Sequence, residues 1–83
     1  MINIQLKPIV TEKAVMMIES GNVLTFKTEK EAMKTQIKKE VESLFNVKVE
    51  KIRTLVKDNK KYAYVQLKKE FAAIDVATKL GIM

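Results

Sequence analysis

Hydrophobic residues recur along this chain with two periods, one typical of strands and the other of helices. Apolar and polar residues alternate over residues 2–6, which predicts a short, half-buried strand that ends at Pro8. Apolar residues at helical spacing then fill residues 12–20. Thr11 is suited to cap the start of this helix, and Gly21 is suited to end it in a left-handed conformation. This segment therefore predicts a strand followed by a helix.

The clearest pattern in the chain is a second, longer amphipathic helix. A short strand over residues 23–26 precedes it, and Thr28 and Glu31 have the spacing of a capping box, which predicts that the helix begins just after Thr28. The apolar positions expected to form its buried stripe are Met33, Ile37, Val41, Leu44 and Phe45. Because the other positions are mostly charged or polar, we expect one face of this helix to lie on the core and the other to face water.

A tight β-hairpin follows the second helix. β-Branched residues dominate residues 47–56, and the alternation slips at residues 50–51, which suggests a bulge. Asp58-Asn59 favours a two-residue turn with positive φ at both positions. Residues 62–67 then alternate cleanly. The face that bears Tyr62, Tyr64 and Gln66 is opposite the one that bears Ala63, Val65 and Leu67.

A third helix is predicted over residues 70–80, where Phe71, Ala73, Ile74, Val76, Ala77 and Leu80 have helical spacing before Gly81. The predicted order is therefore β-α-β-α-β-β-α. This order fits an α+β fold in which three helices pack on an antiparallel four-stranded sheet. At 83 residues, without a linker or a repeat, the chain is expected to form a single domain over residues 1–83.

The composition narrows the range of functions. Cysteine and histidine are both absent, which removes disulfides, thiolate metal sites and the commonest general base. Both glycines stand at predicted helix ends, so no glycine-rich phosphate loop is possible. The two aspartates are not arranged as a metal-binding loop, and the lone Arg53 lacks the phosphate cradle of a small acyl-phosphate hydrolase. We therefore expect neither an enzyme nor a cofactor or metal site.

The chain is basic, with a net charge of +6, and its charge is unevenly distributed. Between Lys34 and Lys61 there are nine basic residues against four acidic ones, so most of the excess positive charge lies in this central part. Such clustering is expected where phosphates are neutralised and their counterions released. A lysine-rich face that only keeps the protein in solution is the alternative. The apolar runs are too short for a membrane span, and we expect a cytosolic protein without membrane insertion.

The candidate chemistry is that of a binding surface. Tyr62 and Tyr64 would project from the hairpin near Lys51 or Arg53 and could stack on unpaired bases. An equally weighted alternative is that these tyrosines form a second apolar layer under a helix. The lysine bias favours phosphate contact over base reading. The methionines Met16, Met17 and Met33 have helical spacing and are expected to fill the core, with a docking strip as the less favoured alternative.

Several segments together resemble a known family. They are Pro8-Ile-Val-Thr-Glu-Lys-Ala14, Lys34-Thr-Gln-Ile-Lys-Lys39, Leu44-Phe-Asn-Val-Lys-Val-Glu-Lys-Ile52, Thr54-Leu55, Ala63-Tyr-Val65 with Leu67, and Asp75-Val-Ala77. In this order and spacing, across essentially the whole chain, they resemble the large-subunit ribosomal protein twenty-three family. The short hairpin turn looks like that of the archaeal branch, because the bacterial branch carries a long extension there.

The resemblance implies a structural protein that binds large-subunit ribosomal RNA beside the opening of the polypeptide exit tunnel. It also implies neighbouring large-subunit ribosomal proteins as partners, and a docking edge for the signal recognition particle or other nascent-chain factors. The RNA-binding candidates are Lys7, Thr11, Lys13, Lys34, Thr35, Gln36, Lys38, Arg53, Lys57, Lys60, Lys61, Tyr62 and Lys68. The docking candidates are Glu12, Glu19 and Asn22. A free-standing single-strand RNA-binding module and a protein-docking adaptor remain as alternatives.

Overall fold

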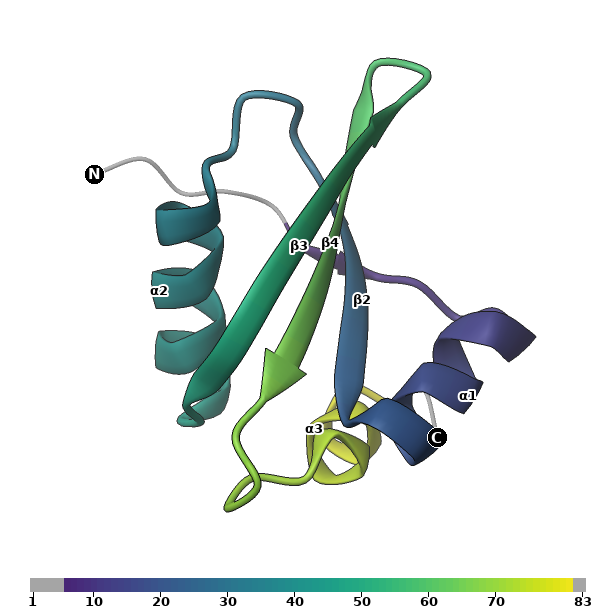
Figure 1. Cartoon of the computed structure of the whole chain (residues 1–83), viewed down its shortest axis with the longest axis vertical. Helices are drawn as coiled ribbons and strands as arrows, with labels where there is room; N and C mark the ends of the chain where they lie inside the picture. The colour runs from purple at the N-terminus through teal and green to yellow at the C-terminus, as the bar shows by residue number, and fades with distance from the viewer. Residues whose placement is uncertain (1–5, 82–83) are drawn as a thin grey trace.

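The computed structural model describes residues 6–81, and within them it forms the predicted α+β fold (Figure 1). The elements in chain order are β1 (Lys7–Pro8), α1 (Glu12–Gly21), β2 (Val23–Thr28), α2 (Lys34–Phe45), β3 (Val49–Lys57), β4 (Lys60–Leu67) and α3 (Ala73–Lys79). The four strands form one antiparallel sheet in the order β1-β2-β4-β3. The predicted strand at residues 2–6 lies almost wholly outside the described residues. The strand observed, β1, instead includes Pro8.

The predicted hairpin is confirmed. Asp58 and Asn59 both have positive φ, at 52° and 61°, which is the backbone that a two-residue turn between twisted strands requires. The register of β3 against β4 shifts between Val49 and Lys51, as the slipped alternation predicted. After this bulge, Lys51 and Arg53 share one face of the sheet, since they pair with Gln66 and Tyr64.

The second helix begins later than predicted. Thr28 remains in β2, where it pairs with Lys61, so it does not cap the helix. The chain turns over the next residues, and α2 starts after Met33, which is extended with ψ of 154°. The side-chain carbonyl of Gln36 accepts a hydrogen bond from the Met33 N–H at 2.9 Å. A side chain three positions on therefore reaches back as in a capping box, but five residues further along the chain than the predicted one.

The start of α1 is confirmed, whereas its end differs from the prediction. The Thr11 hydroxyl accepts a hydrogen bond from the Ala14 N–H at 3.1 Å, as expected of an N-cap. Gly21 is the last helical residue, and Asn22 takes the left-handed conformation with φ of 57°. Asparagine tolerates this conformation better than most residues, and its side chain is used elsewhere, as described below.

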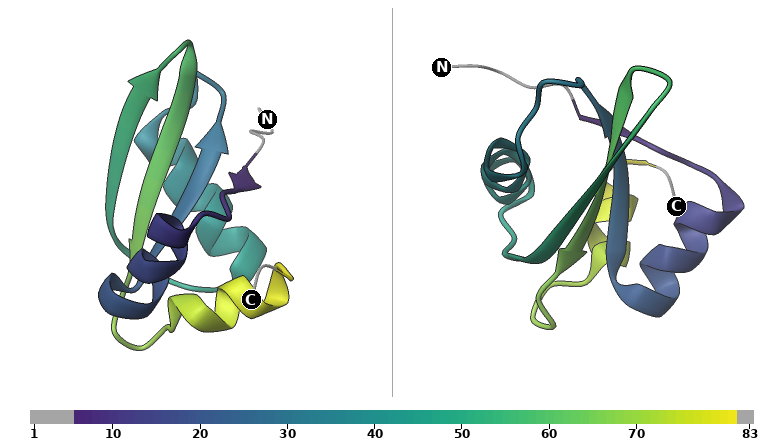
Figure 2. Two further views of the ribbon diagram at one scale, coloured as in Figure 1. Left: turned by 90° about the vertical axis from the view of Figure 1, so that its right-hand side faces the viewer. Right: turned by 45° about the horizontal axis from the view of Figure 1, so that its top comes forward.

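The core lies on one face of the sheet. Helices α2 and α3 cover this face, as Figure 2 shows from the side, and α1 lies along the β2 side of the sheet and contacts β2 and α3. Strands β2 and β4 contribute Leu24, Phe26, Ala63, Val65 and Leu67, and the helices contribute Ile18, Ile37, Val41, Ala73, Val76 and Ala77. The rings of Phe26 and Phe45 stack with centroids 6.1 Å apart. Within residues 6–81, the other face of the sheet carries no such layer.

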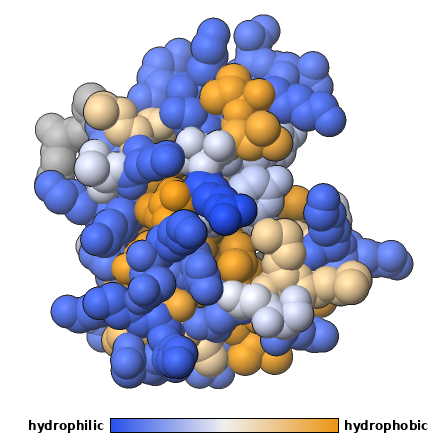
Figure 3. All heavy atoms as spheres, viewed as in Figure 1, coloured by the Kyte–Doolittle hydropathy of each residue, from blue (hydrophilic) through white to orange (hydrophobic). Residues whose placement is uncertain are grey.

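Several apolar residues expected in the core are exposed. Met16 is 66% exposed, Met33 is 61% exposed and Leu44 is 60% exposed, so the core-filler prediction is wrong for two of the methionines. Met33 lies outside the core because α2 starts after it, and Met16 lies on the outer side of α1. Ile74 is also exposed although it lies within α3, whose buried residues are Ala73, Val76 and Ala77. On the face drawn in Figure 3, hydrophobic residues form separate areas on a mostly hydrophilic surface.

Candidate nucleic-acid interface

The face of the sheet opposite the core is open and is here called the open face. Cross-strand pairing sets which residues share it, because side chains alternate along each strand. Tyr64 is the centre of this face, since it pairs with Thr25 on one side and with Arg53 on the other. The remaining members are Lys7 in β1, Val23 and Lys27 in β2, Lys51, Leu55 and Lys57 in β3, and Lys60, Tyr62 and Gln66 in β4.

The open face carries basic residues and no acidic residue at the described positions. In two places lysines are directly opposite one another, Lys7 with Lys27 and Lys57 with Lys60. Like charges in such pairs destabilise a sheet. The pKa of Lys27 is lowered, chiefly by a hydrogen bond from Lys60 and by the charge of Lys60, with smaller contributions from desolvation and from the charge of the opposite Lys7. A bound polyanion would relieve this repulsion.

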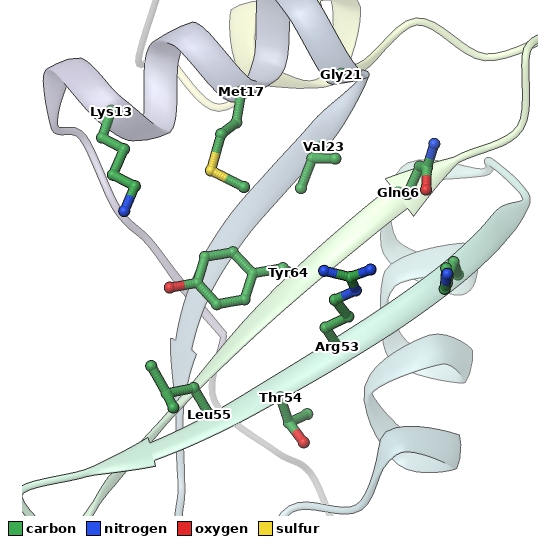
Figure 4. Close-up of a pocket in the computed structure, with 10 residues that line it drawn as sticks. Lys13, Met17, Gly21, Val23, Arg53, Thr54, Leu55, Tyr64 and Gln66 are labelled. Atoms are coloured by element: carbon green, nitrogen blue, oxygen red, sulfur yellow. The ribbon is translucent and has the colours of Figure 1, made fainter.

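Helix α1 converts part of the open face into a groove (Figure 4). Lys13 and Met17 of α1 form one wall, and Val23, Arg53, Tyr64 and Gln66 of the sheet lie across from them in a hollow of about 560 Å³. A second hollow of about 340 Å³ shares Lys13, Met17, Leu55 and Tyr64 with the first and extends toward Lys57 and Tyr62. The two hollows therefore form one groove with an apolar centre and cationic rims.

The floor of this groove contains an unsatisfied polar group. Thr25 lines the second hollow and is only 8% exposed, and its hydroxyl has no hydrogen-bond partner among the described residues. A buried hydroxyl without a partner costs free energy. Thr28, on the core face of the same strand, is in the same condition.

The structure gathers about half of the predicted RNA-binding residues around the open face. Those on it or on the groove wall are Lys7, Lys13, Arg53, Lys57, Lys60 and Tyr62. A separate group, Lys34, Thr35, Gln36 and Lys38, lies on α2, on the other side of the sheet. Lys61 also faces that side, and its ammonium donates a hydrogen bond to the Ala32 carbonyl at 2.7 Å. Lys68 is exposed just after β4, and Thr11 caps α1.

The two interpretations of Tyr62 and Tyr64, a surface for base stacking and an apolar layer under a helix, are each partly confirmed. Tyr62 and Tyr64 are half-buried and do project from the face opposite the core, next to Arg53. Met17 of α1 lies across the groove from Tyr64, so a helix flanks the tyrosines without covering them. An aromatic surface that is reachable from solvent therefore remains.

The docking candidates have different environments. Glu12 and Glu19 are exposed on α1. Asn22 is instead an internal hydrogen-bonding hub: its amide donates to the carbonyls of Leu67 at 3.2 Å and Phe71 at 2.9 Å, and its side-chain carbonyl accepts from the Ala73 N–H at 2.6 Å. Asn22 thus joins the end of β4 to the start of α3, which has no side-chain cap of its own.

Sequence reasoning missed Lys27, a member of the open face, because its strand was predicted to end at Phe26. The observed β2 continues to Thr28 and places Lys27 opposite Tyr62. Alternation from the buried Phe26 would have indicated the outward direction of Lys27. Among residues 6–81, no group of three or more acidic side chains could hold a metal ion, and none of the helices has the length and apolar character of a membrane span.

The sequence of the chain is similar to sequences of known proteins. The sequence profile of the family described as ribosomal protein L23 matches residues 3–76 of the chain. The large ribosomal subunit protein uL23 of the archaeon Picrophilus torridus is 46% identical over 77 residues, which cover 93% of this chain and 94% of that protein. The resemblance inferred from the sequence motifs, including its archaeal character, is thereby confirmed. The chain belongs to the ribosomal protein L23 family.

Proposed function

We propose that the chain is a structural constituent of the large ribosomal subunit that binds ribosomal RNA through its open face, beside the polypeptide exit tunnel. The observation that carries this proposal is the cross-strand pairing of lysines on a face with no acidic residue among those described, in a chain of a ribosomal protein family. As a member of that family the chain is a ribosomal protein of the cytoplasm. Its proposed role involves no catalysis.

Lysines supply most of the positive charge on the open face, which favours contact with phosphates. A lysine ammonium is a compact charge on a flexible stem, whereas reading of base edges relies on the fixed fork of arginine. Arg53 is the one arginine of the chain. Binding should therefore depend steeply on salt, since each neutralised phosphate releases condensed counterions.

The experiment is a salt titration with a large-subunit RNA fragment. Replacing both Lys27 and Lys57 by Gln should weaken binding and reduce the slope of log K against log salt by about 2. Replacing Lys34 and Lys38 by Gln tests the second basic surface, on α2, in the same way. Lys79→Gln, on α3, is the matched control and should leave the slope unchanged. Absent or salt-insensitive binding of the unaltered protein would exclude this function.

The exposed acidic side chains of α1 form the proposed docking edge for nascent-chain factors such as the signal recognition particle. Glu12 and Glu19 lie outside the groove, and neither contributes to its lining. Replacing both by Lys, in particles that contain the protein, should weaken factor recruitment without weakening RNA binding. Cosedimentation with the large subunit measures both effects, and also separates a ribosomal constituent from a free-standing RNA-binding module.

A further inference from the structure

We propose that the groove between α1 and the open face holds a single unpaired nucleotide of the RNA, with its base placed between Tyr64 and Met17. The inference rests on the proposed RNA binding and assigns to one part of the surface a different mode of contact. The rest of the open face contacts phosphates, whereas the groove accepts a base that has left its helix.

The shape of the groove supports a small planar ligand. Its larger hollow, of about 560 Å³, lies within the range of roughly 300–1,000 Å³ that is usual for small-molecule sites. A paired RNA helix buries its bases in the stack, so it can offer only its backbone and groove edges to this surface. An extruded nucleotide, in contrast, brings its base into the hollow while its phosphates stay outside.

The chemistry of the lining supports a nucleotide. Tyr64 offers an aromatic ring and Met17 a polarisable thioether, and Arg53 pairs with Tyr64 across the strands. Bases stack on tyrosine rings and on arginine planes regardless of their sequence. The cations at the rim, Lys13 and Lys57, are suited to the phosphates on either side of the base.

The floor supplies a hydrogen-bonding group that the fold itself does not use. The hydroxyl of Thr25 is buried without a partner among residues 6–81, and the neighbouring Tyr64 pairs with it across the strands. Because the oxygen of this hydroxyl is buried and Thr25 lines the second hollow, a base bound there would reach it only after the Thr25 side chain rotates. The bound base would then provide the hydrogen bond that the free protein lacks.

The tyrosines provide a direct probe. The chain has two tyrosines and no tryptophan, and both tyrosines line the groove, so its intrinsic fluorescence reports on the groove alone. A single-stranded ribonucleotide hexamer, added at low salt, should quench this emission. An abasic ribose-phosphate hexamer of the same charge should bind about tenfold more weakly and leave the emission almost unchanged.

Two variants and their controls complete the test. Tyr64→Leu should weaken binding of the hexamer by about tenfold and leave binding of the abasic strand unchanged, while Tyr64→Phe should bind nearly as the unaltered protein does. Thr25→Val should weaken binding of the hexamer by about threefold, and Thr28→Val, which removes the other unpartnered hydroxyl, should not. Thermal unfolding of each variant verifies that it is folded.

The outcomes separate this inference from the function on which it rests. Equal affinity for the hexamer and the abasic strand would overturn the nucleotide site. The phosphate-binding function would still stand if the large-subunit RNA fragment bound with a steep salt dependence. Failure of that fragment to bind would overturn both proposals.

Discussion

The two faces of the sheet differ in what they contribute to the molecule. Phe26 and Lys27 are neighbours in β2, and yet Phe26 lies in the core and Lys27 among like charges on the open face. In β4, likewise, Val65 lies in the core and Tyr64 lies on the open face. Because side chains alternate along a strand, one short sequence serves stability with every second residue and binding with the residues between.

Each face of the sheet buries one unpartnered hydroxyl, Thr25 on the open face and Thr28 on the core face, but among the described residues the open face also opposes like charges. Opposed lysines and the unpartnered hydroxyl of Thr25 both destabilise the isolated chain. Local conflicts of this kind are expected at functional sites, where a partner removes them. The comparison therefore predicts opposite consequences of substitution on the two faces.

The largest expected effect comes from removing an aromatic ring from each face in turn. Phe26→Ala should lower the free energy of unfolding by about 3–5 kcal/mol, because it leaves a cavity beside Phe45 in the core. Tyr64→Ala should cost only about 1 kcal/mol, the scale of a cross-strand contact on a half-buried surface. Denaturant unfolding measures both. Equal losses would show that the open face is part of the core.

Asn22 joins the end of β4 to the start of α3, and a comparison with Asn46 predicts how much its side chain stabilises the fold. Asn22 and Asn46 both have left-handed backbones, with φ of 57° and 54°, and both end a helix. Asn46→Ala should cost about 1 kcal/mol for this backbone alone. Asn22→Ala should cost roughly 2–3 kcal/mol, since it also removes the hydrogen bonds to β4 and α3.

The difference between these two variants isolates the side-chain network, because the backbone penalty is common to both. Thermal unfolding is a suitable measurement, as 1 kcal/mol corresponds to about 4–8 °C in a domain of this size. If the two variants had the same thermal midpoint, the hydrogen bonds of the Asn22 side chain to β4 and α3 would contribute nothing to stability. Asn22 would then remain available as a docking residue.

The sequence predicted those parts of the fold that depend on neighbouring residues. The turn at Asp58-Asn59, the bulge before Lys51 and the cap at Thr11 are such features, because each arises from a few consecutive residues. The resemblance to the family, confirmed by the comparisons, added the biological context.

The site depended on distant pairings that no local pattern carries. The groove exists because α1 lies beside the open face, and the register of β2 against β4 decides that Lys27 is opposite Tyr62. The capping box at Thr28 failed for the same reason, since pairing with Lys61 keeps Thr28 in the sheet. Tertiary pairing therefore overrode a plausible local signal.

The smallest expected effect is also the one that best separates the two faces. Lys27→Gln should raise the thermal midpoint of the free protein slightly at neutral pH and low salt, because it removes the repulsion from Lys60 that lowers the pKa of Lys27. Below its lowered pKa Lys27 carries its charge, and the repulsion from Lys60 is present. As the pH rises through the lowered pKa, the folded state releases its proton first, and the advantage of the variant should diminish. Added salt should diminish it too.

The same substitution should weaken RNA binding and reduce the salt slope by about 1, whereas Lys79→Gln on α3 should change neither. A fall in both stability and affinity would mean that Lys27 supports the fold, and would remove the distinction between a stabilising face and a binding face.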